Sequence, residues 1–285
     1  MKLSTLPVRA AVIEPGSGLC FIVAAQNHPG YGGTTLLCER IAGIACFDAS
    51  EPDSAGKSVF ERVGDFGRNN YPLSNIHRWL NSNAETGWYT PSHHGDTPPE
   101  TGRLFYNEQP YIQKPGFLSG FSKPFLSAMR EVEVPVVVRT KKGEGELTGV
   151  PAKVFLPSRT EVGKGDENGV AEGLMFPLFH DYTIFKAKPA DELMMLHGRS
   201  LNPPREGAPN DAAQIFDPKY GWMYWMRTAN LLYAFLVRFA SPYGAVGYTY
   251  ANNDIIGVRP CVNLRDDIEV TGDGRPVPTY TIASL

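Results

Sequence analysis

A dense run of aromatic residues near the C-terminal end constrains the fold of this chain more than any other feature. Ten of the 45 residues from Tyr220 to Leu264 are aromatic, against 11% of the whole chain. Tyrosine and tryptophan combine large contact area with few rotatable bonds and a polar tip, so such a segment suits either a core or a recognition surface. Trp222 and Trp225 fit both interpretations equally. Beyond Phe239 the aromatic residues alternate with turn-forming residues, which favours a surface.

Length and charge limit the classes of protein to consider. The 285 residues, 42% of them hydrophobic, suffice for one large domain or two modest ones. The net charge of -3 and the lack of a Lys/Arg cluster argue against nucleic acid as a partner. Pro7 and Arg9 interrupt the start of the chain before any apolar run reaches signal-peptide length. We therefore expect no signal peptide, and, since no run approaches about 18 apolar residues, no membrane insertion.

Short apolar runs separated by glycine and proline predict a β-meander in the first 50 residues. Further strands are expected at 134–140, 154–156, 222–227, 258–264 and 279–282, and helices at 74–81, 123–130 and 190–196. Ser74 is placed to cap the first helix, and Trp79 to anchor it in the core. Strands at both ends, with helices and long loops between them, indicate an α+β fold whose termini pair. We expect a single domain, 1–285, with loop insertions near 82–122 and 157–217.

Four cysteines are present, and none of them shares a CxxC spacing with another. Buried free thiols are the expectation for Cys20, Cys38, Cys46 and Cys261. A disulfide or a reactive thiol is the less favoured alternative.

Five segments in a fixed order carry a family resemblance. They are YPLSNIHRWLN (71–81), GFLSGFS (116–122), VFLPSRTE (154–161), WMYWMR (222–227) and GVRPCVNL (257–264). Together they resemble a C-type-lectin-like domain family of bacteria and their phages, which is related to formylglycine-generating-enzyme-like domains and to the variable proteins of diversity-generating retroelements. The resemblance implies a C-type-lectin-like fold in which Trp225, Gly257 and Arg259 are structural. Arg259 would be a buried, hydrogen-bonded anchor.

The resemblance also implies that the segment between the two late scaffold strands binds a ligand. The ligand-contacting residues would be Tyr224, Arg227, Asn230, Tyr233, Phe235, Arg238, Tyr243, Tyr248, Tyr250, Asn252, Asn253 and Asp254. The expected partner is a bacterial surface protein or glycan, bound by a phage or prophage tail-tip protein located in the virion tail, or in the cytoplasm before assembly. Adenine-directed mutagenesis acts mainly on codons for residues such as Asn, Tyr and Ser, so this segment also fits a retroelement's variable region.

Two other classes of function stay open. A formylglycine-generating-like oxidoreductase would need paired cysteines in the late segment, which contains only Cys261. A structural virion component would use the aromatic face as an interface with its own copies or with other virion proteins. We expect no catalytic residues and no cofactor.

Three polar clusters are candidate sites of chemistry. His93, His94 and Asp96 lie close together in the sequence, but no additional metal ligand is marked beside them. The run from Asn252 to Asp254 holds one charged residue. Neither cluster predicts a metal site. Glu161, Asp166 and Glu167 lie among glycines, which predicts a solvated loop.

Overall fold

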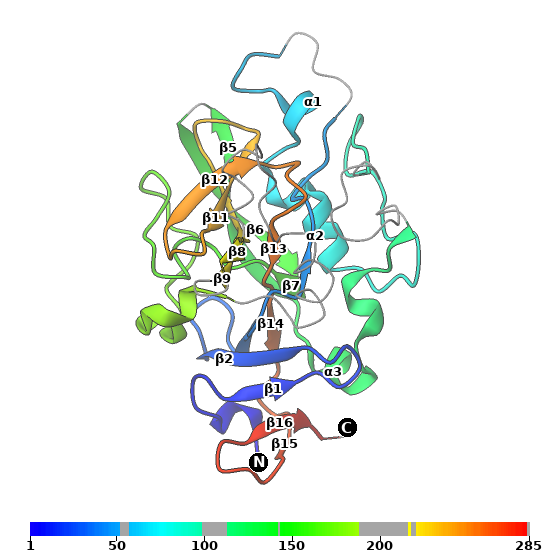
Figure 1. Ribbon diagram of the computed structural model, residues 1–285, viewed down its shortest axis with the longest axis vertical. Coiled ribbons are helices and arrows are strands. Elements are labelled where there is room, and N and C mark those ends of the chain that lie inside the picture. The colour runs from blue at the N-terminus through cyan, green and yellow to red at the C-terminus, as the bar shows by residue number, and fades with distance from the viewer. Residues whose placement is uncertain (52–56, 99–112, 142, 188–215, 218–220, 284–285) are drawn as a thin grey trace.

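Two β-sheets form the centre of the molecule in a computed structural model (Figure 1). The structure describes residues 1–51, 57–98, 113–141, 143–187, 216–217 and 221–283. The expected helix at 190–196 lies outside these residues. Within them the fold is α+β, with short helices and many strands.

The larger sheet has seven strands in the order β15-β16-β1-β2-β3-β14-β7. Their bounds are Val270–Gly272 (β15), Thr279–Ile282 (β16), Ala11–Ile13 (β1), Cys20–Gln26 (β2), Thr34–Cys38 (β3), Cys261–Leu264 (β14) and Val154–Phe155 (β7). β3 and β14 are buried along their whole length, which explains why both are continuous apolar or small-residue runs without alternation. The predicted meander is confirmed as β1, β2 and β3.

The two ends of the chain meet in this sheet. β16 pairs parallel with β1, with Val12 opposite Tyr280, and antiparallel with β15. Figure 1 shows both termini at one end of the molecule, beside β1, β15 and β16. The expected pairing of the termini is confirmed.

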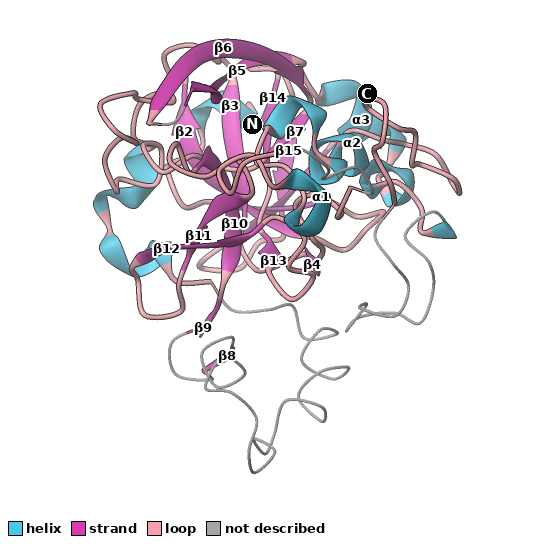
Figure 2. Cartoon of the chain, turned by 90° about the horizontal axis from the view of Figure 1, so that it is seen from above, coloured by secondary structure: helices cyan, strands magenta, loops and turns pink. Residues whose placement is uncertain are grey.

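The second sheet has five strands in the order β12-β11-β10-β13-β4. Their bounds are Val246–Tyr250 (β12), Leu236–Ala240 (β11), Tyr224–Ala229 (β10), Gly257–Val258 (β13) and Gly43–Ile44 (β4). Two more antiparallel pairs join β5 (Val132–Lys141) to β6 (Glu144–Ala152) and β8 (Phe216–Asp217) to β9 (Gly221–Trp222). Figure 2 shows β10, β11 and β12 side by side.

In the described part of the chain three short α-helices lie outside the sheets: α1 (Val63–Phe66), α2 (Asn75–Leu80) and α3 (Lys123–Ala128). α2 begins where predicted, because the Ser74 hydroxyl accepts a hydrogen bond from the His77 amide at 3.3 Å. Trp79 is 6% exposed and is a core residue, as expected. No helix among the described residues has the length and apolar character needed to cross a membrane.

The core is crossed by a buried ion pair that the sequence did not indicate. Arg227 on β10 donates from Nη1 to Glu161 Oε2 at 2.6 Å and from Nη2 to Oε1 at 2.8 Å, and both side chains are fully buried. Its Nε donates to the carbonyl of Pro135 on β5 at 2.9 Å. The solvated loop predicted around Glu161 is therefore wrong at this residue. It is also wrong at Glu167, which is 2% exposed.

Arg259 is a second buried arginine, and it confirms the structural role expected of it. Its guanidinium donates to the carbonyls of Cys38, Ile184 and Glu39 at 2.8 to 3.2 Å. The same group lies 5.3 Å from the ring centroid of Tyr224. Arg259 thereby joins the end of β3 to the residues beside β10.

Candidate functional site

Three large aromatic side chains are exposed on the hairpin formed by β11 and β12. Tyr243, Tyr248 and Tyr250 are 51%, 56% and 45% exposed. Tyr248 and Tyr250 are two residues apart on β12, so they lie on the same face of the sheet. Among the described residues β12 is an edge strand that pairs only with β11. These three residues and Arg238, which lies opposite Tyr248, are called the tyrosine surface.

Arg238 is fixed in place by a buried carboxylate. Its Nε and Nη2 donate to the two oxygens of Glu167 at 2.9 and 2.6 Å, which is a bidentate geometry. Arg159 donates to the same carboxylate at 2.9 Å. The guanidinium of Arg238 lies 5.4 Å from the ring centroid of Tyr248, within cation–π range. The exposed ring of Tyr248 thus packs on a side chain that has little freedom to move.

Tyr250 is supported by helix α1. Its ring stacks on Phe66 of α1, with centroids 4.4 Å apart and planes 15° apart. A second stack joins Tyr233 to Phe60 at 5.4 Å. Both phenylalanines come from the 57–70 segment, so this segment packs against the tyrosine hairpin and its neighbouring loop. Neither phenylalanine was predicted to belong to the site.

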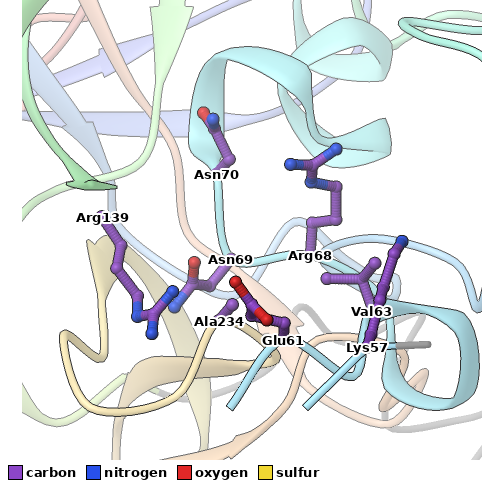
Figure 3. Close-up of a pocket in the computed structure, with 8 residues that line it drawn as sticks. All are labelled: Lys57, Glu61, Val63, Arg68, Asn69, Asn70, Arg139 and Ala234. Atoms are coloured by element: carbon purple, nitrogen blue, oxygen red, sulfur yellow. The ribbon is translucent and has the colours of Figure 1, made fainter. Parts of the chain in front are cut away.

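A pocket of about 360 Å³ lies beside these stacks (Figure 3). It is lined by Lys57, Glu61, Val63, Arg68, Asn69, Asn70, Arg139 and Ala234. Figure 3 shows Arg139 and Lys57 on opposite sides, with Asn69 and Glu61 between them. Three of the lining residues are cationic and one is acidic, so the lining carries a net positive charge.

Asn69 holds the wall of this pocket in one conformation. Its Nδ2 donates to the carbonyls of Asn230, Tyr233 and Leu236 at 2.8 to 3.0 Å. Its backbone amide donates to the carbonyl of Ala234 at 2.7 Å. The loop between β10 and β11 is therefore tied to the 57–70 segment, which fixes this wall of the pocket.

Comparison with known families places the whole arrangement in a single domain family. A model of a domain of unknown function, DUF6273, matches residues 32–266, a range that includes every residue of the tyrosine surface and of the pocket. The chain belongs to the DUF6273 family. No curated protein and no solved structure matches this DUF6273 chain.

The DUF6273 structure separates the twelve expected ligand contacts into two groups. Tyr224, Arg227, Asn230 and Phe235 are at most 7% exposed and lie in the core, so they are unavailable to a ligand. The other eight are exposed or partly exposed: Tyr233, Arg238, Tyr243, Tyr248, Tyr250, Asn252, Asn253 and Asp254. Tyr224 and Arg227 lie on β10, whose six residues are all buried, and Asn230 and Phe235 lie in the loop between β10 and β11. The sequence of β10 did not indicate that Arg227 would be buried together with its apolar neighbours.

The polar run from Asn252 to Asp254 forms a turn between β12 and β13. Asn252 donates to Ser50 Oγ at 2.8 Å and to the Asp65 carbonyl at 3.1 Å. Asn253 Oδ1 accepts from the Ile255 amide at 3.2 Å. These amides stabilise the turn, in agreement with the interpretation favoured over calcium binding.

His93 and Asp96, considered as metal ligands, have structural partners. His93 Nε2 lies 3.1 Å from Glu51 Oε1, and Asp96 accepts from the Ser92 amide and from Asn75. In the described part of the chain, no three His, Cys, Asp or Glu side chains are grouped as possible metal ligands. Cys261 is fully buried on β14, and burial raises its pKa well above the ordinary value. All four cysteines are free thiols.

Proposed function

We propose that this DUF6273 protein binds a ligand through the tyrosine surface. The observation that carries the proposal is the row of exposed tyrosines on an edge hairpin, supported by Arg238 beneath Tyr248 and Phe66 beneath Tyr250. Exposed aromatic rings that are already ordered lose little conformational entropy on binding. The surface is therefore suited to recognition.

The partner that we propose is a bacterial surface protein or glycan, bound by a tail-tip protein of a phage or prophage. The family resemblance supports this context, and so does the arrangement of the scaffold. In a C-type-lectin-like fold the late Trp strand and the Gly-x-Arg strand would flank the binding segment. Here Trp225 lies on β10 and Gly257 on β13, and these strands pair through Tyr224 and Gly257. The hairpin between them presents the tyrosines.

The double variant Tyr248→Ala/Tyr250→Ala tests this function. We expect it to weaken binding of the labelled protein to a panel of bacterial cells by about 2 kcal/mol or more, the loss typical of central anchors. This corresponds to about a thirty-fold change in Kd, measured by flow cytometry. Val277→Ala is the control, because Val277 is 85% exposed and lies in the loop between β15 and β16. Equal binding by the double variant and the wild type would refute the assignment.

The edge position of β12 favours one second candidate, a subunit interface. An edge strand has unpaired backbone groups that can extend a sheet into a second copy or into another virion protein. In that case Tyr248→Ala/Tyr250→Ala would dissociate an oligomer in native mass spectrometry and leave cell binding unchanged. Loss of cell binding by a protein that is monomeric in both forms would exclude this candidate.

A further inference from the structure

The pocket beside the tyrosine surface has the size and the lining of a small-ligand site. Its volume of about 360 Å³ lies within the range of pockets that hold small molecules. Its residues come from three separate parts of the fold: the 57–70 segment, the end of β5 and the β10–β11 loop. None of its residues belongs to the tyrosine surface, so binding in this pocket is independent of the proposed function.

The charges in the lining favour an anion. Lys57, Arg68 and Arg139 outnumber the single carboxylate of Glu61. Burial raises the pKa of the nearby Glu51. The positive charges of Lys57 and Arg68 oppose that rise, so both side chains interact electrostatically with Glu51. Arg139 forms no ion pair with any described residue.

Two polar atoms of the lining are buried without a partner. Arg139 Nε has no hydrogen-bond acceptor and Asn70 Oδ1 has no donor among the described residues. Buried polar atoms are normally satisfied, and leaving one unsatisfied costs about 1–3 kcal/mol. The unsatisfied donor of Arg139 matches a ligand that supplies an acceptor, whereas the Asn70 side chain points away from Glu61 and Arg139 (Figure 3).

We propose that this pocket binds a small hydroxylated carboxylate. A carboxylate matches the planar fork of the Arg139 guanidinium. Hydroxyl groups on the same ligand would donate to the carboxylate of Glu61. Glu61 would repel a doubly charged phosphate more strongly than a singly charged carboxylate. Glu61 lies between Arg139 and Lys57, so a carboxylate bound by Arg139 would leave the hydroxyls of the ligand near Glu61 (Figure 3).

Four probe molecules test the contributions of the carboxylate and of the hydroxyl groups separately. Gluconate carries a carboxylate and hydroxyls, sorbitol carries hydroxyls only, hexanoate carries a carboxylate only, and inorganic phosphate is a bare anion. We expect gluconate to shift the backbone amide signals of residues 57–70 and 139 in an NMR titration, and to bind about ten-fold or more tightly than each of the other three. Equal affinity for sorbitol would refute the anion site. Equal affinity for hexanoate or phosphate would refute the hydroxyl contacts, and no shift with gluconate would overturn the proposal.

Substitutions test which side chains of the lining contribute to gluconate binding. Arg139→Gln removes the fork and should weaken gluconate binding about ten-fold or more. Lys57→Gln, at an exposed residue whose replacement leaves the core intact, should weaken it to a smaller extent. Arg62→Gln is the matched control, since Arg62 carries the same charge on the same segment but does not line the pocket. Equal weakening by Arg62→Gln and Arg139→Gln would show a diffuse charge effect and overturn the site. Tyr248→Ala/Tyr250→Ala should leave gluconate binding unchanged, which keeps this test separate from that of the proposed function.

Discussion

Arg227 illustrates how burial changes the role of a charged residue. Its position in an aromatic segment suggested ligand contact, yet its guanidinium is enclosed by Glu161 and by the carbonyls of Pro135 and Leu156. Glu161 is 66 residues earlier in the chain, and its neighbouring glycines resemble a solvated loop. No local pattern connects the two residues. A buried pair of this kind becomes visible only when the fold brings the segments together.

The buried His77 should make the folded protein less stable in acid. Burial lowers its pKa from about 6.5 to about 4. Between these values the unfolded chain gains a proton at His77 that the folded protein does not accept, so the free energy of unfolding falls as the pH falls from about 6.5 to about 4. The contribution is up to about 3 kcal/mol. Urea unfolding at several pH values should show a shallower fall in His77→Gln than in the wild type.

The control for this measurement is His180→Gln, at an exposed histidine. We expect its free energy of unfolding to follow the wild-type dependence on pH. Identical slopes for His77→Gln and the wild type between about pH 4 and 6.5 would contradict the assignment to His77.

Helix α2 is an element whose start was predictable, because its signals are local. Ser74 caps it, and its buried face consists of Ile76, Trp79 and Leu80, spaced as on one side of a helix. A helix of six residues has little stability of its own. It depends on this cap and on packing, so the cap is a sensitive position.

Ser74→Ala should lower the free energy of unfolding by about 1–2 kcal/mol. The substitution removes the acceptor of the His77 amide, and it also removes the hydroxyl donor to the Tyr71 carbonyl. Ser17→Ala deletes the same group at an exposed turn and should change stability by less than about 0.5 kcal/mol. Equal effects in chemical denaturation would show that the cap contributes nothing specific.

The β11–β12 hairpin shows where strand prediction fails. The sequence predicted an aromatic surface in this region but no strands. Gly247, which argued against a strand, lies opposite Phe239, whose ring fills the space that a side chain at Gly247 would need. The glycine is thus compatible with the strand because of its partner across the sheet. Information about that partner is absent from a local window.

At the scale of the whole molecule, the meander and the pairing of the termini could be predicted, and the pocket could not. Apolar runs bounded by glycine and proline identify β1, β2 and β3. The pocket depends on Arg139, Ala234 and a segment near residue 60, which lie far apart in the sequence. The accessible tyrosines were expected from their turn-forming neighbours. Their supports, Phe66 and Glu167, were not.

The pairing of the termini gives a prediction for the stability of the whole fold. Thr281 lies on β16 opposite Ile13 of β1 and Thr271 of β15, and its side chain is exposed. Thr281→Pro places a residue without a backbone N–H in a strand that has neighbours on both sides. We expect the midpoint of thermal unfolding to fall by about 5 °C or more. Thr281→Ala keeps the N–H and should stay close to the wild type, and similar values for the two variants would contradict the expectation.

The position of the two chain ends gives the molecule a polarity. Both ends lie beside β1 and β16, whereas α1 and β12 lie toward the other end (Figure 1). A tether attached to either end would hold the protein by its base and direct the tyrosines and the pocket outward. The hairpin that carries the tyrosines thus lies away from the strands where the two chain ends meet.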